Sequence, residues 1–342
     1  MAKYSADLFQ APAAAAVRQV GLLHLEAARV ARQRLDGGDD EEALHDFRVA
    51  LRRLRSLLRA FRPVLDSVVS GKLRRRLRDL ARLTGTARDA EVRLAWARDA
   101  RRRLPASRRA GVAWWIAQLA EQRDGAYREL HKTAVSDFDK ILPRVRRALT
   151  TPSPEEAPGT FGQAVGERVG VEAGELGRRL ALIQSIADEA EAHGARIEVK
   201  RIRYLLEPLA TERRIEDLLK SLRQAQDALG ALHDIQAIGT TLGEAAAEAA
   251  AERTRERHRI AMRRPTLALL PKRRPKPSPT GLLALAGLAR GEEERLFRHV
   301  RRGRVLRALP GELAALASHL AAPAPTPATT PVLPAEAIVP GK

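Results

Sequence analysis

Residues 44–61 and 192–209 carry the same helical pattern, and the second stretch follows the first at an offset of 148 positions. In both stretches apolar residues recur every three or four positions, so they fall on one face of an α-helix. A shorter match follows each stretch, since Gly85-Thr-Ala-Arg-Asp89 corresponds to Gly230-Ala-Leu-His-Asp234 at an offset of 145. A duplication of this kind predicts two similar helix bundles in one chain.

The remainder of the sequence favours helices as well. Ala, Leu, Arg and Glu, which are strong helix formers, dominate the composition, and only 4% of the residues are aromatic. We therefore predict an all-α fold with one helix bundle in residues 11–150 and a second in residues 161–310. The Pro- and Glu-rich stretch 150–159 is a predicted linker, and the Ala/Pro/Thr-rich residues 321–342 are a predicted disordered tail.

Helical periodicity, interrupted by Pro and Gly residues, predicts the helix boundaries within these bundles. In the first half the predicted helices cover residues 12–35, 39–65, 68–84, 87–103, 106–133 and 136–149. In the second half they cover residues 161–190, 191–210, 212–229, 231–262 and 281–309. Glycines recur at every fourth position early in this half and predict a close helix crossing at Gly162, Gly166, Gly170 and Gly174.

The excess of basic over acidic residues indicates which kinds of molecule the protein could bind. The chain has 61 basic and 42 acidic residues, a net charge of +19, which favours nucleic acid, an anionic membrane or another polyanion. A GC-rich genome also enriches arginine, which outnumbers lysine 52 to 9. The absence of cysteine excludes disulfides and Cys-based zinc sites. Because the sequence shows neither a signal peptide nor a bilayer-spanning apolar run, we expect a cytoplasmic location.

The first repeated stretch places a basic stripe directly beside its apolar face. On a helical wheel of about 100° per residue this stripe falls within a sector of about 80°, and it consists of His45, Arg48, Arg52, Arg55 and Arg59. The apolar face consists of Leu44, Phe47, Leu51, Leu54, Leu58 and Phe61. Basic side chains at this spacing recur about every 5 Å along a helix, so successive guanidinium groups could meet the phosphates of a polymer.

The second stretch repeats this layout with one departure. Its apolar face is Ala192, Ala195, Val199, Ile202, Leu206 and Leu209, and its basic stripe is His193, Arg196, Lys200 and Arg203. At the last step Glu207 stands in place of a basic residue, and Pro208 ends the helix. A solvated helix face often carries Glu partners at i±4, which the first stripe lacks. We therefore interpret the two stripes as an anion-binding surface.

The duplicated pattern H-x-x-R-x-x-x-[RK]-R-x-R, with a G-x-x-[RH]-D element after each copy, resembles the CHAD family, the conserved histidine α-helical domain. The resemblance covers roughly residues 11–310. It implies two four-helix bundles, related by pseudo-twofold symmetry, around a basic central pore that binds inorganic polyphosphate. Members of the family are associated with polyphosphate granules or are fused to a triphosphatase domain.

By this resemblance both copies contribute side chains to the pore. The residues that would bind polyphosphate are His45, Arg48, Arg52, Arg53, Arg55, Arg88, His193, Arg196, Lys200, Arg201, Arg203, Tyr204 and His233, with Asp89 and Asp234 in support. Arg59 joins this set from its place in the first basic stripe. Glu207 and the segment 253–276, which carries ten basic residues and one acidic residue, fit the family's pattern less well. We expect the later part of that segment to be a solvated basic loop.

Individual members of this set have simpler interpretations. His45 and His193 could be neutral residues that pack between helices, whereas histidines that point at phosphate should be charged. Asp89 and Asp234 could cap a helix or hold a neighbouring arginine.

Sequence motifs for catalysis are absent. The chain has no Walker A loop, no G-x-G-x-x-G, no H-E-x-x-H and no Cys/His metal cluster. The triphosphatase domain of CHAD fusion proteins carries an E-x-E-x-K motif, and the closest string, Glu189-Ala-Glu-Ala-His193, lacks the lysine. Phosphate chemistry normally needs metal-binding carboxylates, of which the stripes offer few. We therefore expect a binding protein without a cofactor or a metal site, not an enzyme.

Two other functions stay open at the level of the sequence. Residues 44–109 carry 20 basic and 6 acidic residues, a surplus that suits nucleic acid, although aromatic residues for base stacking are few and no groove-reading motif is present. A scaffold is a third possibility, with the segment 253–276 in contact with an anionic membrane or a granule shell. The sequence predicts no oligomeric state.

Overall fold

A computed structural model describes residues 4, 6–36, 41–152, 159–263 and 279–322 of the chain, and nearly all of these are helical. The α-helices are α1 (Ala13–Leu35), α2 (Glu41–Ala60), α3 (Arg62–Leu65), α4 (Gly71–Arg102), α5 (Arg109–Glu129), α6 (Ser136–Thr150), α7 (Phe161–Leu182), α8 (Glu189–Leu206), α9 (Arg213–Arg263), α10 (Pro279–Arg302) and α11 (Arg304–Ala321). Short 3₁₀ or π turns are η1 (Ala6–Phe9), η2 (Ala106–Arg108), η3 (Leu130–Val135) and η4 (Glu207–Leu209). Within these residues no β-strand occurs, so the prediction of an all-α fold is confirmed.

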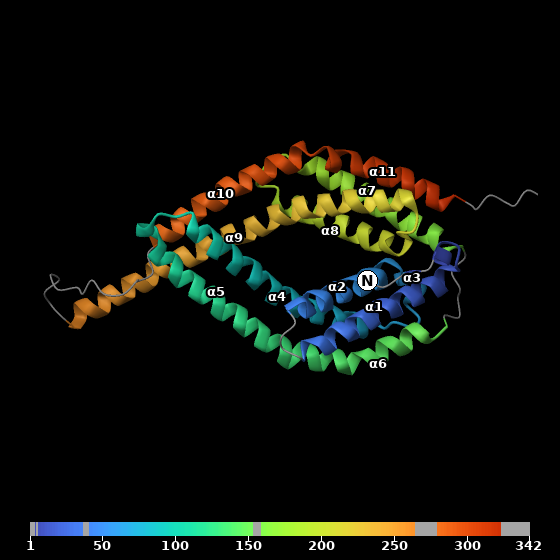
Figure 1. The fold of residues 1–342 in the computed structure, drawn as a ribbon, viewed down its shortest axis with the longest axis horizontal. Coiled ribbons are helices and arrows are strands. Elements are labelled where there is room, and N and C mark those ends of the chain that lie inside the picture. The colour runs from blue at the N-terminus through green and yellow to red at the C-terminus, as the bar shows by residue number, and fades with distance from the viewer. Residues whose placement is uncertain (1–3, 5, 37–40, 153–158, 264–278, 323–342) are drawn as a thin grey trace, which may run out of the picture.

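The helices form two groups that follow each other in the chain. In Figure 1, α1 to α6 lie mainly on the lower side of the molecule and α7 to α11 mainly on the upper side, while the end of α9 extends to the lower left. The groups contact each other where α5 packs against α10, where α1 packs against α7, and where α2 packs against α8. The two helices that contain the repeated pattern therefore lie next to each other at the junction of the groups.

Several predicted helix boundaries were wrong. The helix α4 runs through Gly85 and α9 runs through Gly230, where the sequence predicted breaks. A glycine inside a helix costs only about 1 kcal/mol, which the packing of long helices readily offsets. Residues 183–188 connect α7 to α8 instead of being helical, and the predicted helix over 281–309 is divided at Gly303 into α10 and α11.

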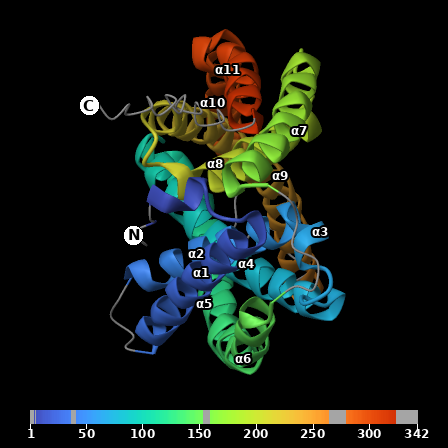
Figure 2. The same cartoon turned by 90° about the vertical axis from the view of Figure 1, so that its right-hand side faces the viewer.

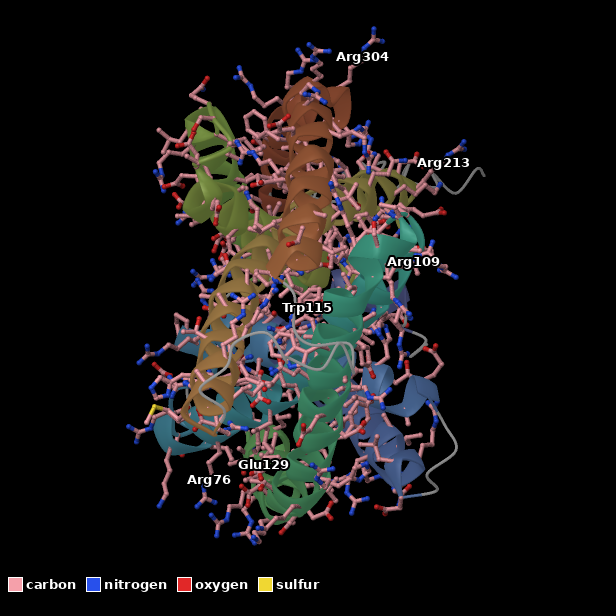
Figure 3. All side chains as sticks on the ribbon, turned by 90° about the vertical axis from the view of Figure 1, so that its left-hand side faces the viewer. Arg76, Arg109, Trp115, Glu129, Arg213 and Arg304 are labelled. Atoms are coloured by element: carbon pink, nitrogen blue, oxygen red, sulfur yellow. The ribbon has the colours of Figure 1, made fainter. Side chains whose placement is uncertain are left out.

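The apolar faces of both repeated helices are buried, as predicted. All six apolar residues of each copy belong to one continuous hydrophobic core. Phe47 of α2 meets the ring of Phe138 of α6 edge-on with 5.1 Å between ring centroids, and Phe61 lies 5.8 Å from Phe161 at the start of α7. Figure 3 shows Trp115 of α5 inside the molecule, while Arg76, Arg213 and Arg304 lie at its periphery. Burial of the apolar faces fixes the direction in which each basic stripe points.

Gly166 of α7 allows α11 to approach closely, so the predicted helix crossing is present at this one of the four glycines. Figure 2 shows α7 and α11 together at the top of the molecule. A Cβ atom added at Gly166 would lie 2.7 Å from the Cβ of Leu320, closer than real Cβ atoms approach. At Gly162 the added atom would meet the ring of Phe9 at 2.8 Å. Gly174 faces open space, so the close approach does not extend along the whole glycine series.

Some predictions fall on parts of the chain outside the described residues. These are most of the linker (153–158), the later part of the basic segment (264–276) and the tail from residue 323 onward. The earlier part of the basic segment, up to Arg263, belongs to α9. None of the helices within the described ranges is both long enough and apolar enough to cross a membrane.

Candidate functional site

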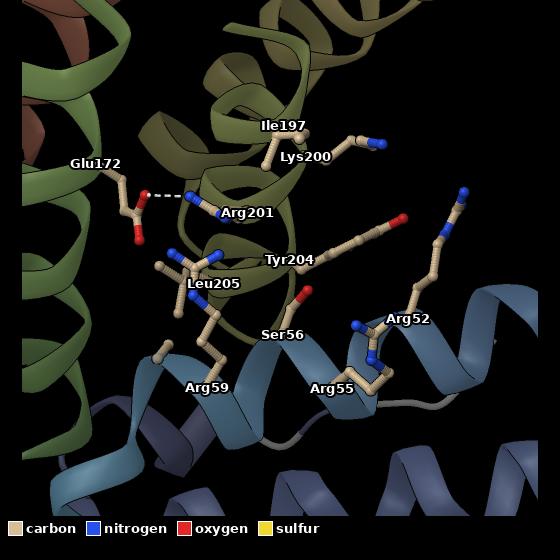
Figure 4. Close-up of a pocket in the computed structure, with 11 residues that line it drawn as sticks. Arg52, Arg55, Ser56, Arg59, Glu172, Ile197, Lys200, Arg201, Tyr204 and Leu205 are labelled. Carbon is tan, nitrogen blue, oxygen red and sulfur yellow. Dashed lines mark ion pairs between the residues drawn. The ribbon is translucent and has the colours of Figure 1, made fainter. Parts of the chain in front are cut away.

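The two repeated helices line a common pocket. Its volume is about 310 Å³, and α2 contributes Arg52, Arg55, Ser56, Arg59 and Ala60, α7 contributes Glu172, and α8 contributes Ile197, Lys200, Arg201, Tyr204 and Leu205. Figure 4 shows Lys200 and Tyr204 projecting from α8 and Arg52 from α2 toward the same space. Two parts of the chain that are 148 positions apart thus contribute basic side chains to one cavity.

Four cations lie close together at this site: Arg52 and Lys200 in the pocket wall, and Arg48 of α2 and Arg196 of α8 near them. We call them the central cations. Burial, together with Arg196, Arg52 and Arg48, lowers the pKa of Lys200 to about 7. Burial, and then Arg52, lowers the pKa of Arg48 to about 10. Cations affect each other in this way only when they lie close together in a partly dehydrated space, so the site concentrates positive charge.

Two carboxylates, one from each G-x-x-[RH]-D element, lie beside the central cations. Asp234 of α9 is 3.9 Å from Arg196, measured from Oδ1 to Nη2. Both Asp234 and Asp89 of α4 favour the charged form of Arg196, although burial lowers its pKa overall. Burial raises the pKa of Asp234 above its ordinary value, even though the charge of Arg196 lowers it. The structure thus brings Asp89 and Asp234 close to basic side chains of the two repeated helices.

Most cations of the pocket have no carboxylate partner. Within the described part of the chain, no ion pair involves Arg48, Arg52, Arg55, Arg59 or Lys200. The Nε atoms of Arg52 and Arg196 and the hydroxyl of Tyr204 are buried without a hydrogen-bond partner among these residues. The guanidinium group of Arg52 lies over the ring of Tyr204, 5.9 Å from its centroid. Buried donors without partners are costly, and an anion in the pocket would satisfy them.

The histidines occupy different environments. His193 and His233 are in contact, with 3.3 Å between their Nδ1 atoms. Burial and the neighbouring Arg196 lower the pKa of both rings, that of His233 to about 4, which favours neutral imidazoles in the absence of a ligand. His45, the counterpart of His193, is exposed at the start of α2. Arg88, the counterpart of His233, pairs with Glu91 at 2.7 Å.

Three predicted site residues form ion pairs with other parts of the fold. Arg53 lies 2.6 Å from Glu207, and Arg203 lies 3.2 Å from the other oxygen of the same carboxylate. Arg201 is 2.6 Å from Glu198 and 3.5 Å from Glu172. These arginines are thus partly neutralised inside the protein. The contacts Arg53–Glu207 and Arg201–Glu172 join different helices, so a helical wheel could not reveal them, whereas Arg203–Glu207 and Arg201–Glu198 are neighbours on one helix face.

The described residues contain no group of three or more His, Cys, Asp or Glu side chains that could hold a metal ion. The residues present suit the binding of anions. Arginine presents planar donors that match pairs of phosphate oxygens, and Lys200 adds a point charge to the same pocket.

Comparisons with solved structures find proteins with a similar fold. The crystal structure of the CHAD domain from the plant Ricinus communis matches with a TM-score of 0.59 and 23% sequence identity, over 90% of this chain and 93% of that chain. PptA from Streptomyces chartreusis matches with a TM-score of 0.58 and 17% identity, over 88% of this chain and 98% of that chain. At these identities the likeness shows the fold alone. No curated protein matches the sequence.

The family itself is shown by sequence. The pattern that describes the CHAD domain matches residues 19–243, a range that contains both repeated stretches and more than half of the chain. This protein therefore belongs to the CHAD domain family.

Proposed function

We propose that this chain binds inorganic polyphosphate in a basic pore formed by two copies of one helical unit, and that it holds the polymer without cleaving it. The observation that carries this proposal is the presence of Arg52 and Lys200, one from each repeated helix, in the wall of the same pocket. Neither forms an ion pair within the described residues. Positive charge concentrated in this way attracts a ligand with many closely spaced negative charges.

The order and spacing of the helices support a pore to which each half of the chain contributes corresponding helices. The helices α1 and α7 begin 148 positions apart, as do α2 and α8. A long helix follows each pair, α4 in the first half and α9 in the second. It carries Asp89 in α4 and Asp234 in α9, and both carboxylates favour the charged form of Arg196. Each half thus provides a basic helix and a supporting carboxylate.

The chemistry of the pocket favours phosphate groups over nucleobases. Tyr204 is the one aromatic residue among those that line it, and the guanidinium group of Arg203 covers its ring at 4.8 Å from the centroid. Little aromatic surface is left for base stacking, which contributes much of the affinity for single-stranded nucleic acid. Membership in the CHAD family supports polyphosphate as the ligand, and binding of this kind would direct the chain to polyphosphate granules.

We also propose that the chain does not cleave the polyphosphate that it binds. Asp89 and Asp234 are the carboxylates beside the central cations, and both interact electrostatically with Arg196. Carboxylates engaged with arginine are poorly placed to hold the metal ions that phosphoryl transfer normally uses.

The first test is substitution of the two cations that carry the proposal. We expect Arg52→Gln and Lys200→Gln each to weaken the binding of labelled long-chain polyphosphate about tenfold, and the double variant about a hundredfold, because each removes a charge-assisted contact. Fluorescence anisotropy at constant salt measures the affinity.

Arg76→Gln and Arg213→Gln are the matched controls, since both side chains are exposed at the periphery of the molecule. Equal losses in these controls would contradict the proposed site. In competition, polyphosphate should displace labelled DNA more readily than DNA displaces polyphosphate, and the opposite order would favour a nucleic-acid ligand.

A further inference from the structure

A carboxyl pair that the binding of phosphate does not require lies in one wall of the pocket. Glu198 of α8 is only 3% exposed, and Glu172 of α7 lines the pocket. Arg201 connects them, since its Nη1 atom is 2.6 Å from Glu198 Oε1 and 3.5 Å from Glu172 Oε2. Figure 4 marks the second of these contacts with a dashed line. A cation of the anion site is therefore held by two negative groups at the edge of that site.

The surroundings make Glu198 a proton-binding group near neutral pH. Burial, and next the adjacent Glu172 carboxyl, raise the pKa of Glu198 to about 8, although Arg59 of α2 and Arg179 of α7 oppose the shift. Its Oε2 atom is buried without a hydrogen-bond partner among the described residues, an unfavourable position for a charged oxygen. On the other side of α8, α9 brings His233 and Asp234 against His193 and Arg196.

We propose that Glu172, Glu198 and Arg201 form a proton-controlled latch, which sets whether Arg201 is available to polyphosphate in the neighbouring pocket. When both carboxyls are ionised, they hold Arg201 and place extra negative charge in the pocket wall. When one of them binds a proton, the pair loses one negative charge and Arg201 can turn toward a phosphate. This inference rests on the proposed function, because it concerns the same pocket and the same ligand.

The direction of the pH effect follows from the sign of the shift. A carboxyl whose pKa is raised is protonated below about pH 8 and ionised above it. Protonation favours the binding of an anion here, so the affinity for polyphosphate falls as the pH rises through this range. The number of cations in contact with the ligand falls at the same time.

The dependence of affinity on salt tests this directly. The slope of the logarithm of the affinity against the logarithm of the salt concentration reports the number of phosphate contacts made by cations. At about pH 6.5 we expect this slope to be shallower for Arg201→Gln than for the unaltered chain, by about one contact. At about pH 9.5 the two slopes should coincide. A difference of the same size at both pH values, or at neither, overturns the latch.

A second variant isolates the proton-binding group. Glu198→Gln keeps the shape of the side chain but cannot ionise, so between about pH 6.5 and 9.5 it should lose less affinity for polyphosphate than a chain in which Glu198 still titrates. Glu167→Gln is the matched control, because it removes the same charge from an exposed position of α7. The titration of Lys200 is common to both variants and cancels in their comparison. If both variants show the same pH dependence, the latch is wrong.

These experiments distinguish a failure of the latch from a failure of the proposed polyphosphate binding. If Glu198→Gln does not fold, as circular dichroism would show, Glu172→Gln takes its place, since Glu172 is less buried. A chain that binds no polyphosphate at either pH contradicts the proposed function. A chain that binds polyphosphate through Arg52 and Lys200, but whose salt slope differs from that of Arg201→Gln by the same amount at both pH values, contradicts the latch alone.

Discussion

Arg52 and Arg53 are adjacent in the sequence, but their side chains have different partners. A helix rotates by about 100° per residue, so Arg52 points into the pocket while Arg53 points toward Glu207 at the end of α8. Burial lowers the pKa of Arg53, but the hydrogen bond and charge of Glu207 outweigh burial and raise it overall. Glu207 interrupts the second basic stripe, and its ion pair with Arg53 connects the end of α8 to α2.

The lowered pKa of Lys200 predicts that binding takes up protons. In the unliganded chain its pKa is about 7, and a bound polyanion should raise it toward the ordinary value. At about pH 8 we expect binding to transfer part of a proton from buffer to protein, and the affinity to fall as the pH rises above about 7. Titration calorimetry in buffers with different ionisation enthalpies counts these protons.

Lys200→Arg should take up fewer protons, because arginine stays charged at these pH values. Lys220→Arg is the control, since Lys220 is an exposed lysine whose pKa is raised by hydrogen bonds to Asp217 and Glu216. An uptake that is the same in Lys200→Arg and in the unaltered chain would show that Lys200 does not titrate on binding.

At the scale of helices, the pattern of apolar residues predicted α2 and α8 well, since every residue of their apolar faces is buried. Helix boundaries were predicted less well where a glycine was taken to mark the end of a helix. Gly85 and Gly230 lie inside continuous helices, whereas Gly303 separates α10 from α11. Glycine permits a break without requiring one, and the tertiary packing decides between the two outcomes.

The packing of α7 against α11 makes a prediction about stability. Gly166→Ala should lower the free energy of unfolding by about 1–3 kcal/mol, because the added Cβ would lie 2.7 Å from Leu320 Cβ and 2.9 Å from the backbone nitrogen of Ala321. Gly174→Ala, on the same helix with nothing within 4 Å, should raise it by about 0.5–1 kcal/mol through helix propensity. Denaturant unfolding measures both values. Equal effects of the two substitutions would mean that α11 does not pack here.

At the scale of the whole molecule, the repeat in the sequence was the most informative feature. It predicted which helices carry the basic stripes, and the family resemblance, not the helical wheel, implied that the stripes face one another. The carboxyl partners of Arg53, Arg201 and Arg203 were not predicted. Glu207 lies 154 positions from Arg53, and Glu172 belongs to another helix than Arg201, so these two contacts depend on how helices pack in space. Arg203–Glu207 and Arg201–Glu198 are neighbours within one helix turn, and their spacing in the sequence could have indicated them.

A crystal structure of the chain with a bound polyphosphate of defined length tests the central claim most directly. We predict phosphate groups in the pocket between α2 and α8, with oxygens within hydrogen-bond distance of Arg52 from one helix and Lys200 from the other, at about 2.7–3.2 Å. Phosphates bound only to peripheral arginines such as Arg76 and Arg213, with the pocket free of ligand, would contradict it.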